Sequence, residues 1–349
     1  MGILNVSALI ALSIVVFGPS FIGPRAADCW GDRANDYSCY QERYQDLVYN
    51  SGVEAAFTDL KDEFAKEQFV KVACHQLTHV IGRAAADLYG DDIASTYSRG
   101  DDFCASGYYH GAMETVVANL GADNILDEAD GICADLRERQ NRSLNHRNCA
   151  HGLGHGFMGL YQNELFESLE ACDALSNGWE GDHCSGGVFM QNIMDEENSS
   201  NPSKYLKADR PFYPCTEVKT EYKYQCYSRN AVYALKTQGD DFAKTFDLCG
   251  KVEDGFRPSC YVGLGTQATS LSTSDQRTDE AQTDYIRELC MQGQDAEAQT
   301  TCLAAAVRNL IFFYDSDEQA KALCESLTRE DWRAGCHQVR KEYMAERGR

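Results

Sequence analysis

Apolar and polar positions along the chain alternate between helix-like runs and short polar turns. Residues 226–236 form one such run, residues 238–241 a polar turn, and residues 242–249 a second run. The same order returns with an apolar run over residues 302–314 and a shorter run over residues 318–324. Runs of this length, separated by turns that contain Gly and Asp, predict helical hairpins and an all-α fold.

Cysteines recur along the chain with the same period as the predicted helical units. Those that open a helix-like run stand at positions 149, 184, 226, 260, 302 and 336, so successive units begin 35, 42, 34, 42 and 34 residues apart. Periods in the thirties and low forties are typical of stacked helical hairpins. We therefore predict an α/α solenoid in which residues 28–349 form a single repeat domain, with a histidine-rich part over residues 70–160 and plain repeats over residues 161–349.

Four of the units also share a glycine three residues after the cysteine, namely Gly107, Gly152, Gly187 and Gly263. Glycine inside a helix is unfavourable, so something must offset its cost. Either a neighbouring helix packs against the bare backbone, which we favour, or a ligand lies there.

The sixteen cysteines are an even number, as an oxidised protein requires. The simplest scheme pairs each cysteine with the next: 29–39, 74–104, 133–149, 172–184, 215–226, 249–260, 290–302 and 324–336. Closing a loop of this size stabilises the fold by about 2–3 kcal/mol in the chain-entropy model. A rival scheme joins the two ends of one hairpin, such as Cys226 with Cys249, and spacing alone leaves both open.

The amino-terminal segment over residues 1–27 contains an apolar run followed by Arg25-Ala26-Ala27. Such a segment predicts an export signal, or else an uncleaved anchor. Export agrees with the cysteine content, because a reducing cytosol would keep the thiols free. The expected location is secreted or otherwise extracytoplasmic.

The chain is strongly acidic, with 54 acidic against 32 basic residues and a formal net charge of −22 at pH 7. Binding to nucleic acid requires clustered Lys and Arg that displace counterions, so this partner class is excluded. Anionic lipid would repel the chain as well. We therefore expect no membrane contact beyond the possible amino-terminal anchor.

Several helix-like runs end in Leu-Cys, at Leu248-Cys249, Leu289-Cys290 and Leu323-Cys324, and a further cysteine opens the next run. In this respect the chain resembles the secreted cysteine-rich Sel1-like repeat proteins, relatives of the tetratricopeptide arrays, over residues 133–336. It lacks the Gly-x-Gly-Val turn and the regular spacing of that family. The resemblance implies an α/α solenoid that binds a peptide or protein on its concave face, and not a catalytic activity.

The histidine-rich part contains three pairs of residues spaced four apart: His75 with His79, His110 with Glu114, and His151 with His155. Residues four apart lie on one face of a helix, and equivalent positions on stacked helices line one surface. The sequence therefore predicts that three neighbouring helices bring five imidazoles and one carboxylate together. This set suits a divalent transition metal, namely zinc, iron, copper or manganese.

Six ligands exceed the needs of one tetrahedral ion. Either two ions bind, or some residues serve as supporting or acid–base groups. A dinuclear centre could activate water, and Glu114 would then be the bridging ligand or the catalytic general base. Reduced copper is an alternative because Met113, Met158 and Met190 lie near the same face, although methionines at helical spacing are more often core residues.

Two functions remain open at this point. The first is an exported metal-binding protein, which would be an oxidoreductase or hydrolase if its centre is catalytic and would act on a small-molecule or peptide ligand. The second is a non-catalytic extracytoplasmic scaffold that binds a protein or peptide, with the histidines serving only to pack helices together. The remaining histidines, His146, His183 and His337, are expected to be core or surface residues.

Overall fold

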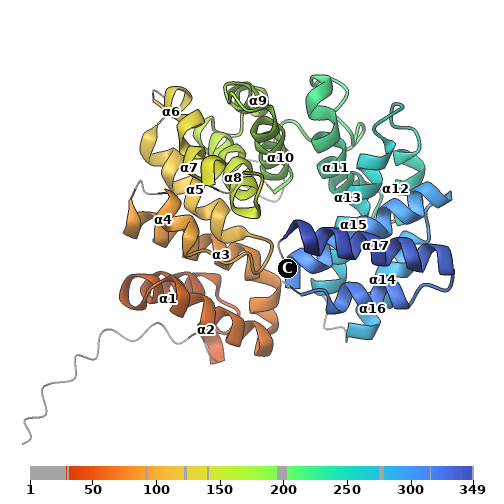
Figure 1. Cartoon of the computed structure of the whole chain (residues 1–349), viewed down its shortest axis with the longest axis horizontal. Helices are drawn as coiled ribbons and strands as arrows, with labels where there is room; N and C mark the ends of the chain where they lie inside the picture. The colour runs from red at the N-terminus through yellow and green to blue at the C-terminus, as the bar shows by residue number, and fades with distance from the viewer. Residues whose placement is uncertain are drawn as a thin grey trace, which may run out of the picture.

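The computed structural model describes residues 29, 31–90, 93–121, 124–139, 141–194, 203–274, 279–314 and 316–347. The predicted signal or anchor over residues 1–27 lies outside them. Across the described part, the chain forms helices and turns with no strand, so the predicted all-α class is confirmed (Figure 1). None of the helices in this part is both long and apolar enough to cross a bilayer.

The longest helices pack against one another in chain order. They are α3 (Gln68–Tyr89), α5 (Gly107–Leu120), α8 (Leu144–Leu160), α10 (Gly178–Met194), α11 (Thr220–Thr237), α13 (Arg257–Ser274), α15 (Ala296–Tyr314) and α17 (Glu330–Glu346). Each contacts the next in this order. Because every member is flanked by its sequence neighbours, equivalent positions on successive helices come to lie side by side.

Shorter helices connect the long ones. They are α4 (Ile93–Ser98), α6 (Ile125–Ile132), α7 (Ala134–Arg139), α9 (Leu165–Asp173), α12 (Phe242–Cys249), α14 (Asp279–Cys290) and α16 (Glu318–Glu325), while α1 (Tyr37–Ser51) and α2 (Val53–Lys66) precede α3 after the 3₁₀ turn Gly31–Arg33. Side-chain caps define several helix starts: Asp36, Ser143 and Asp241 each accept a hydrogen bond from a backbone N–H in the first turn. Each such cap stabilises its helix by about 1 kcal/mol.

The sequence pattern predicted that cysteines begin the long helices. In the structure they lie within these helices instead. Helix α11 begins at Thr220, before Cys226, and α15 begins at Ala296, before Cys302. The physical reason is that the disulfide forms where the side of a long helix passes the end of the preceding short helix. That crossing lies beyond the first turn of the long helix.

Eight disulfides pair every cysteine with the next one along the chain, which confirms the sequential scheme and shows that the rival scheme is wrong. No cysteine is free in the described part. Cys249, the last residue of α12, bonds to Cys260 in α13, and Cys290, the last residue of α14, bonds to Cys302 in α15. This number of disulfides indicates an oxidising, extracytoplasmic environment.

The shared glycines allow the long helices to approach closely. A Cβ atom built on each would lie within 3 Å of the preceding long helix: Gly107 2.3 Å from Thr78 Oγ1, Gly152 2.9 Å from Met113 Cβ, Gly187 2.0 Å from His151 O, and Gly263 2.1 Å from Ser228 O. Any larger residue would push the helices apart. Helix packing therefore accounts for these glycines, which is the explanation that we favoured over a ligand from the sequence.

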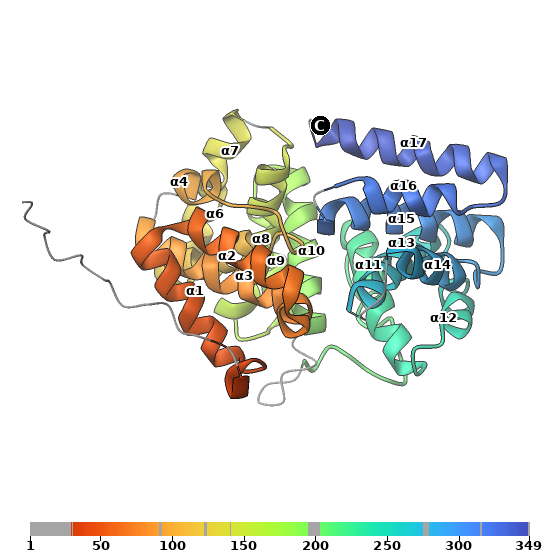
Figure 2. The ribbon, with the colours of Figure 1, turned by 90° about the horizontal axis from the view of Figure 1, so that it is seen from below.

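The array curls so that its end returns to its beginning. Helices α1 to α10 form one half and α11 to α17 the other, and the two halves lie side by side (Figures 1 and 2). Beyond the α10–α11 junction, α13 contacts α3, and the rings of Phe64 and Phe313 lie 6.2 Å apart. Arg347 forms an ion pair with Asp102 in which both side chains are buried. We call these four residues the closure contact.

Candidate metal centre

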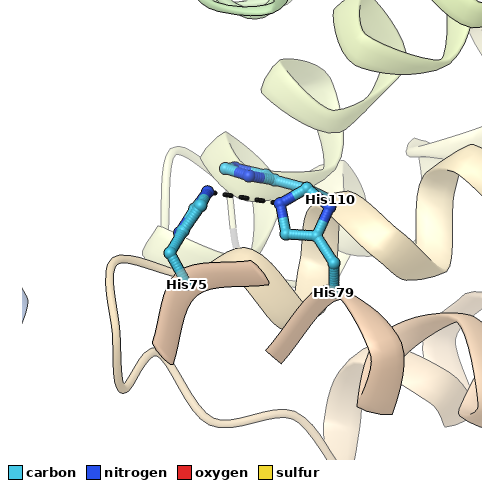
Figure 3. Close-up of side chains that lie close together, drawn as sticks. All are labelled: His75, His79 and His110. Atoms are coloured by element: carbon cyan, nitrogen blue, oxygen red, sulfur yellow. Dashed lines mark hydrogen bonds between the residues drawn. The ribbon is translucent and has the colours of Figure 1, made fainter. Parts of the chain in front are cut away.

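Three adjacent helices bring the five predicted histidines together. Helix α3 carries His75 and His79, α5 carries His110, and α8 carries His151 and His155. The ring of His110 lies at the middle, with ring centroids 5.4 Å from His75 and 5.3 Å from His79 (Figure 3), and 5.0 Å from His151 and 4.5 Å from His155. We call these five side chains the histidine cluster.

The cluster contains two groups that could hold a metal ion. His75, His79 and His110 form one group, and His110, His151 and His155 form the other. In each group the candidate ligand atoms all lie within 4.8 Å of one another. His110 belongs to both, and its Nδ1 is buried without a hydrogen-bond partner. An unsatisfied buried nitrogen is costly, and coordination of an ion would satisfy it.

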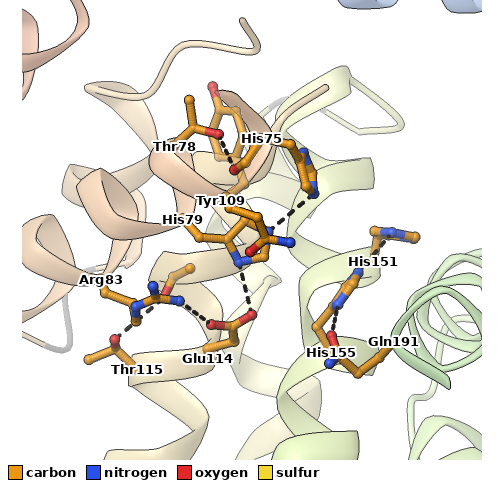
Figure 4. A network of polar contacts seen from close by, with 12 residues as sticks. His75, Thr78, His79, Arg83, Tyr109, Glu114, Thr115, His151, His155 and Gln191 are labelled. Atoms are coloured by element: carbon orange, nitrogen blue, oxygen red, sulfur yellow. Dashed lines mark hydrogen bonds and ion pairs between the residues drawn. The ribbon is translucent and has the colours of Figure 1, made fainter. Parts of the chain in front are cut away.

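Each of the other four histidines is oriented through its Nδ1 atom. The acceptors are Cys104 O for His75 at 2.9 Å, Glu114 Oε1 for His79 at 3.1 Å, His183 O for His151 at 3.3 Å, and Gln191 Oε1 for His155 at 2.8 Å (Figure 4). Because all four acceptors are oxygens, Nδ1 must carry the proton in each neutral ring. The Nε2 atoms therefore present lone pairs, the form that binds metals.

These Nε2 atoms face each other in pairs. His75 Nε2 lies 3.2 Å from His79 Nε2 (Figure 3), and His151 Nε2 lies 3.3 Å from His155 Nε2. Two opposed lone pairs cannot hydrogen-bond, whereas a cation between them is attracted to both. Two nitrogen ligands of one tetrahedral zinc ion, each about 2.0–2.1 Å from the metal, lie about 3.3 Å apart. The observed separations match this value.

Burial disfavours the charged form of four of the five histidines in the cluster. It lowers the pKa of His75 to about 3 and that of His155 to about 4, and it lowers the pKa values of His110 and His151 well below the ordinary value. Neighbouring imidazoles act in the same direction, since two positive charges would repel each other. Neutral rings can take up a metal ion without first losing protons.

Glu114 lies on the far side of His79 from His75. Its Oε1 accepts the hydrogen bond from His79 Nδ1, and its Oε2 accepts one from Arg83 Nη1 at 2.9 Å. Burial opposes ionisation of this carboxyl, but the hydrogen bond and electrostatic attraction to His79, with smaller contributions from His155 and Arg83, bring its pKa down to about 2. A carboxylate that orients a ligating histidine is a common support in metal sites. That Glu114 is itself a ligand or a catalytic base stays a prediction.

Several supporting groups escaped the sequence analysis. Arg83 follows His79 by four residues on α3, and Gln191 directly follows Met190, so helical spacing could have suggested both. The carbonyls of Cys104 and His183 left no sequence signal, because any residue supplies a carbonyl. Met113 and Met158, which had suggested copper, are completely buried in the hydrophobic core.

The remaining histidines lie outside the cluster. His146 is completely buried, accepts a hydrogen bond from the backbone N–H of Arg142 and donates one to Glu180 Oε1 at 2.5 Å. The ring of His183 packs against Trp179 at 4.3 Å, and His337 lies on the distant helix α17.

No family model, curated protein or solved structure matches this chain. The resemblance to Sel1-like repeat proteins therefore stays a prediction, and the geometry of the histidine cluster is the guide to function.

Proposed function

We propose that this chain is an extracytoplasmic metal-binding protein and that its histidine cluster holds a divalent transition-metal ion. One observation carries the proposal. Two pairs of Nε2 atoms face each other at 3.2 and 3.3 Å, while the Nδ1 atoms on their far sides are held by oxygen acceptors. Histidines that served only to pack helices would not be expected to place the lone pairs of their Nε2 atoms face to face.

The ligand chemistry favours zinc or copper among the candidate metals. The converging atoms are imidazole nitrogens, which suit these ions, whereas manganese prefers oxygen ligands. Disulfide bonding leaves no thiolate in the described part. His110 belongs to both groups, so either one ion binds or two ions share this residue.

A catalytic centre is the finer form of the proposal. Three imidazoles around an ion leave a fourth position for water or substrate, as catalytic zinc sites do. His75 is half-buried, whereas the other four rings are buried, which makes the α3 side the more accessible one. We expect a substrate to approach from there.

Elemental analysis tests the proposal. The full chain is purified without a His tag from an oxidising compartment, and metal is measured per protein by inductively coupled plasma mass spectrometry. We expect one or two equivalents. Replacing His75, His79, His151 and His155 together by Ala should remove the metal, whereas His337→Ala on α17 is the matched control. Wild-type protein without metal, or undiminished metal in the quadruple variant, would contradict the proposal.

A further inference from the structure

A turn of left-handed backbone lies between the closure contact and the histidine cluster. Its residues are Cys104, Ala105 and Ser106, with φ angles of 56°, 59° and 62°, and none of them is glycine. The left-handed region is unfavourable for residues that carry a side chain, and three such residues in succession are rare. Strained backbone persists only where the surrounding structure holds it, and it is concentrated at functional sites. We call these three residues the left-handed turn.

The left-handed turn is held by the helices that carry the histidine cluster. Cys104 is joined by a disulfide to Cys74 on α3. Ser106 Oγ accepts a hydrogen bond from Asn148 Nδ2 on α8 at 3.1 Å, and both side chains are buried. The turn leads directly into α5, which carries His110. Its backbone is therefore fixed against all three helices of the cluster.

Asp102 joins the left-handed turn to the second half of the molecule. Its backbone oxygen accepts a hydrogen bond from the N–H of Ser106 at 3.0 Å, which closes the turn. Helix α17 ends beside the first half (Figure 2), and Arg347, directly after it, forms the buried ion pair with the side chain of Asp102. The guanidinium of Arg347 also lies 5.9 Å from the ring of Phe312 on α15. The residue that closes the turn is thus the one that receives the end of α17.

The left-handed turn also orients a candidate metal ligand. The oxygen of Cys104 accepts the hydrogen bond from His75 Nδ1 at 2.9 Å. Directly after the turn, a Cβ on Gly107 would lie 2.5 Å from His75 O, so the start of α5 is packed tightly against the backbone of this ligand. Backbone dihedral angles set the direction of a carbonyl. Relaxation of the turn would therefore direct the oxygen of Cys104 away from His75.

We propose that the left-handed turn positions His75 for the metal, and that docking of Arg347 on Asp102 regulates metal affinity through this turn. With the ion pair formed, the turn keeps its strained backbone and His75 keeps its orientation. Without the ion pair, the turn relaxes and the hydrogen bond to Cys104 O weakens, so the group that contains His75 binds metal less tightly. The inference rests on the proposed function, because it concerns affinity for the same ion.

Competition between the full chain and a chromogenic chelator for zinc measures this effect. Arg347→Gln should weaken zinc affinity about tenfold, the lower end of what loss of a supporting contact costs a metal site. Arg340→Gln is the matched control, because this arginine is on α17 and pairs with Asp317 inside the second half. Unchanged affinity in R347Q, or an equal loss in R340Q, would overturn the inference and leave the proposed function intact. Wild-type protein that binds no zinc would overturn both.

Two further variants separate positioning of the ligand from a general loss of stability. His75→Ala leaves the other group of the cluster to bind zinc, and adding R347Q to it should cause no further loss, because the turn then has no ligand to position. Ala105→Gly should restore the affinity of R347Q, since glycine adopts left-handed backbone without strain. All affinities are measured at a temperature where circular dichroism shows every variant folded. The same loss in the His75→Ala background, or no restoration by A105G, would overturn the inference.

Discussion

The two halves of the molecule share one scaffold and differ in one set of side chains. In the first half, a Cβ on Gly154 would lie 2.0 Å from Cys184 O, and in the second half a Cβ on Gly265 would lie 2.2 Å from Cys302 O. Sequential disulfides tie hairpins together in both halves. Close helix contacts and disulfides therefore belong to the fold, whatever the chemistry.

The difference appears in the histidines of the first half. The sixth residue after Cys104 and Cys149 is histidine, at His110 and His155, whereas the sixth residue after Cys226, Cys260 and Cys302 in the second half is Val232, Thr266 or Arg308. Side chains at this position face those of adjacent helices, so histidines there meet. A chemical site thus needs only a few substitutions on a repeating scaffold.

The largest expected effect concerns the contact that joins the two halves. Asp102→Asn leaves the buried Arg347 without its charged partner, and breaking such a pair costs about 3–5 kcal/mol. Denaturant unfolding would measure the loss in the free energy of unfolding. The control is Asp331→Asn, because its pair with Arg329 is exposed and contributes little to stability. Equal losses in the two variants would show that the ion pair of the closure contact stabilises the fold no more than an exposed ion pair does.

Removing one disulfide from either half should lower stability by the same amount. Only the removal in the first half should weaken metal binding. Replacing Cys133 and Cys149, or Cys290 and Cys302, by Ala opens a loop worth about 3 kcal/mol in either case. Only the first pair adjoins α8, which carries two of the metal ligands. We expect weaker metal binding in that variant alone. Equal metal affinity in both would contradict a site confined to the first half.

Glu114 tests whether the metal ligands depend on their supports. Glu114→Ala removes the acceptor that orients His79, and losses of this kind weaken metal affinity about 10–100-fold. Glu114→Gln retains an oxygen acceptor and should restore part of the affinity. Competition with a chromogenic chelator measures both variants. A carboxylate that binds the metal directly would instead make the two equally weak.

The smallest effect is the pH dependence of the chelated protein. The folded pKa values of His75 and His155, about 3 and about 4, lie below the unfolded value, so the unfolded chain takes up protons first on acidification. Stability is therefore greatest above pH 6.5 and falls until the folded pKa values are reached. Between pH 7 and 5.5 the loss is about 1 kcal/mol for each of these two histidines. The quadruple histidine variant should lose much less in the same unfolding titration.

The sequence predicted the helical hairpins and made sequential disulfide pairing the simplest scheme, because both depend on residues close together along the chain. A short helix that ends at Cys249 brings Cys260 within reach of it whatever the rest of the molecule does. The meeting of His110 with His155 was also predictable, since equivalent positions on stacked helices lie side by side.

Only the tertiary structure decided the contacts between distant repeats. Local spacing along the chain does not encode how the second half packs against the first. This packing brings Arg347 to Asp102, a partner 245 residues away along the chain. A backbone carbonyl from α10 likewise orients His151. These interactions depend on the three-dimensional path of the chain, so the residue types alone do not predict them.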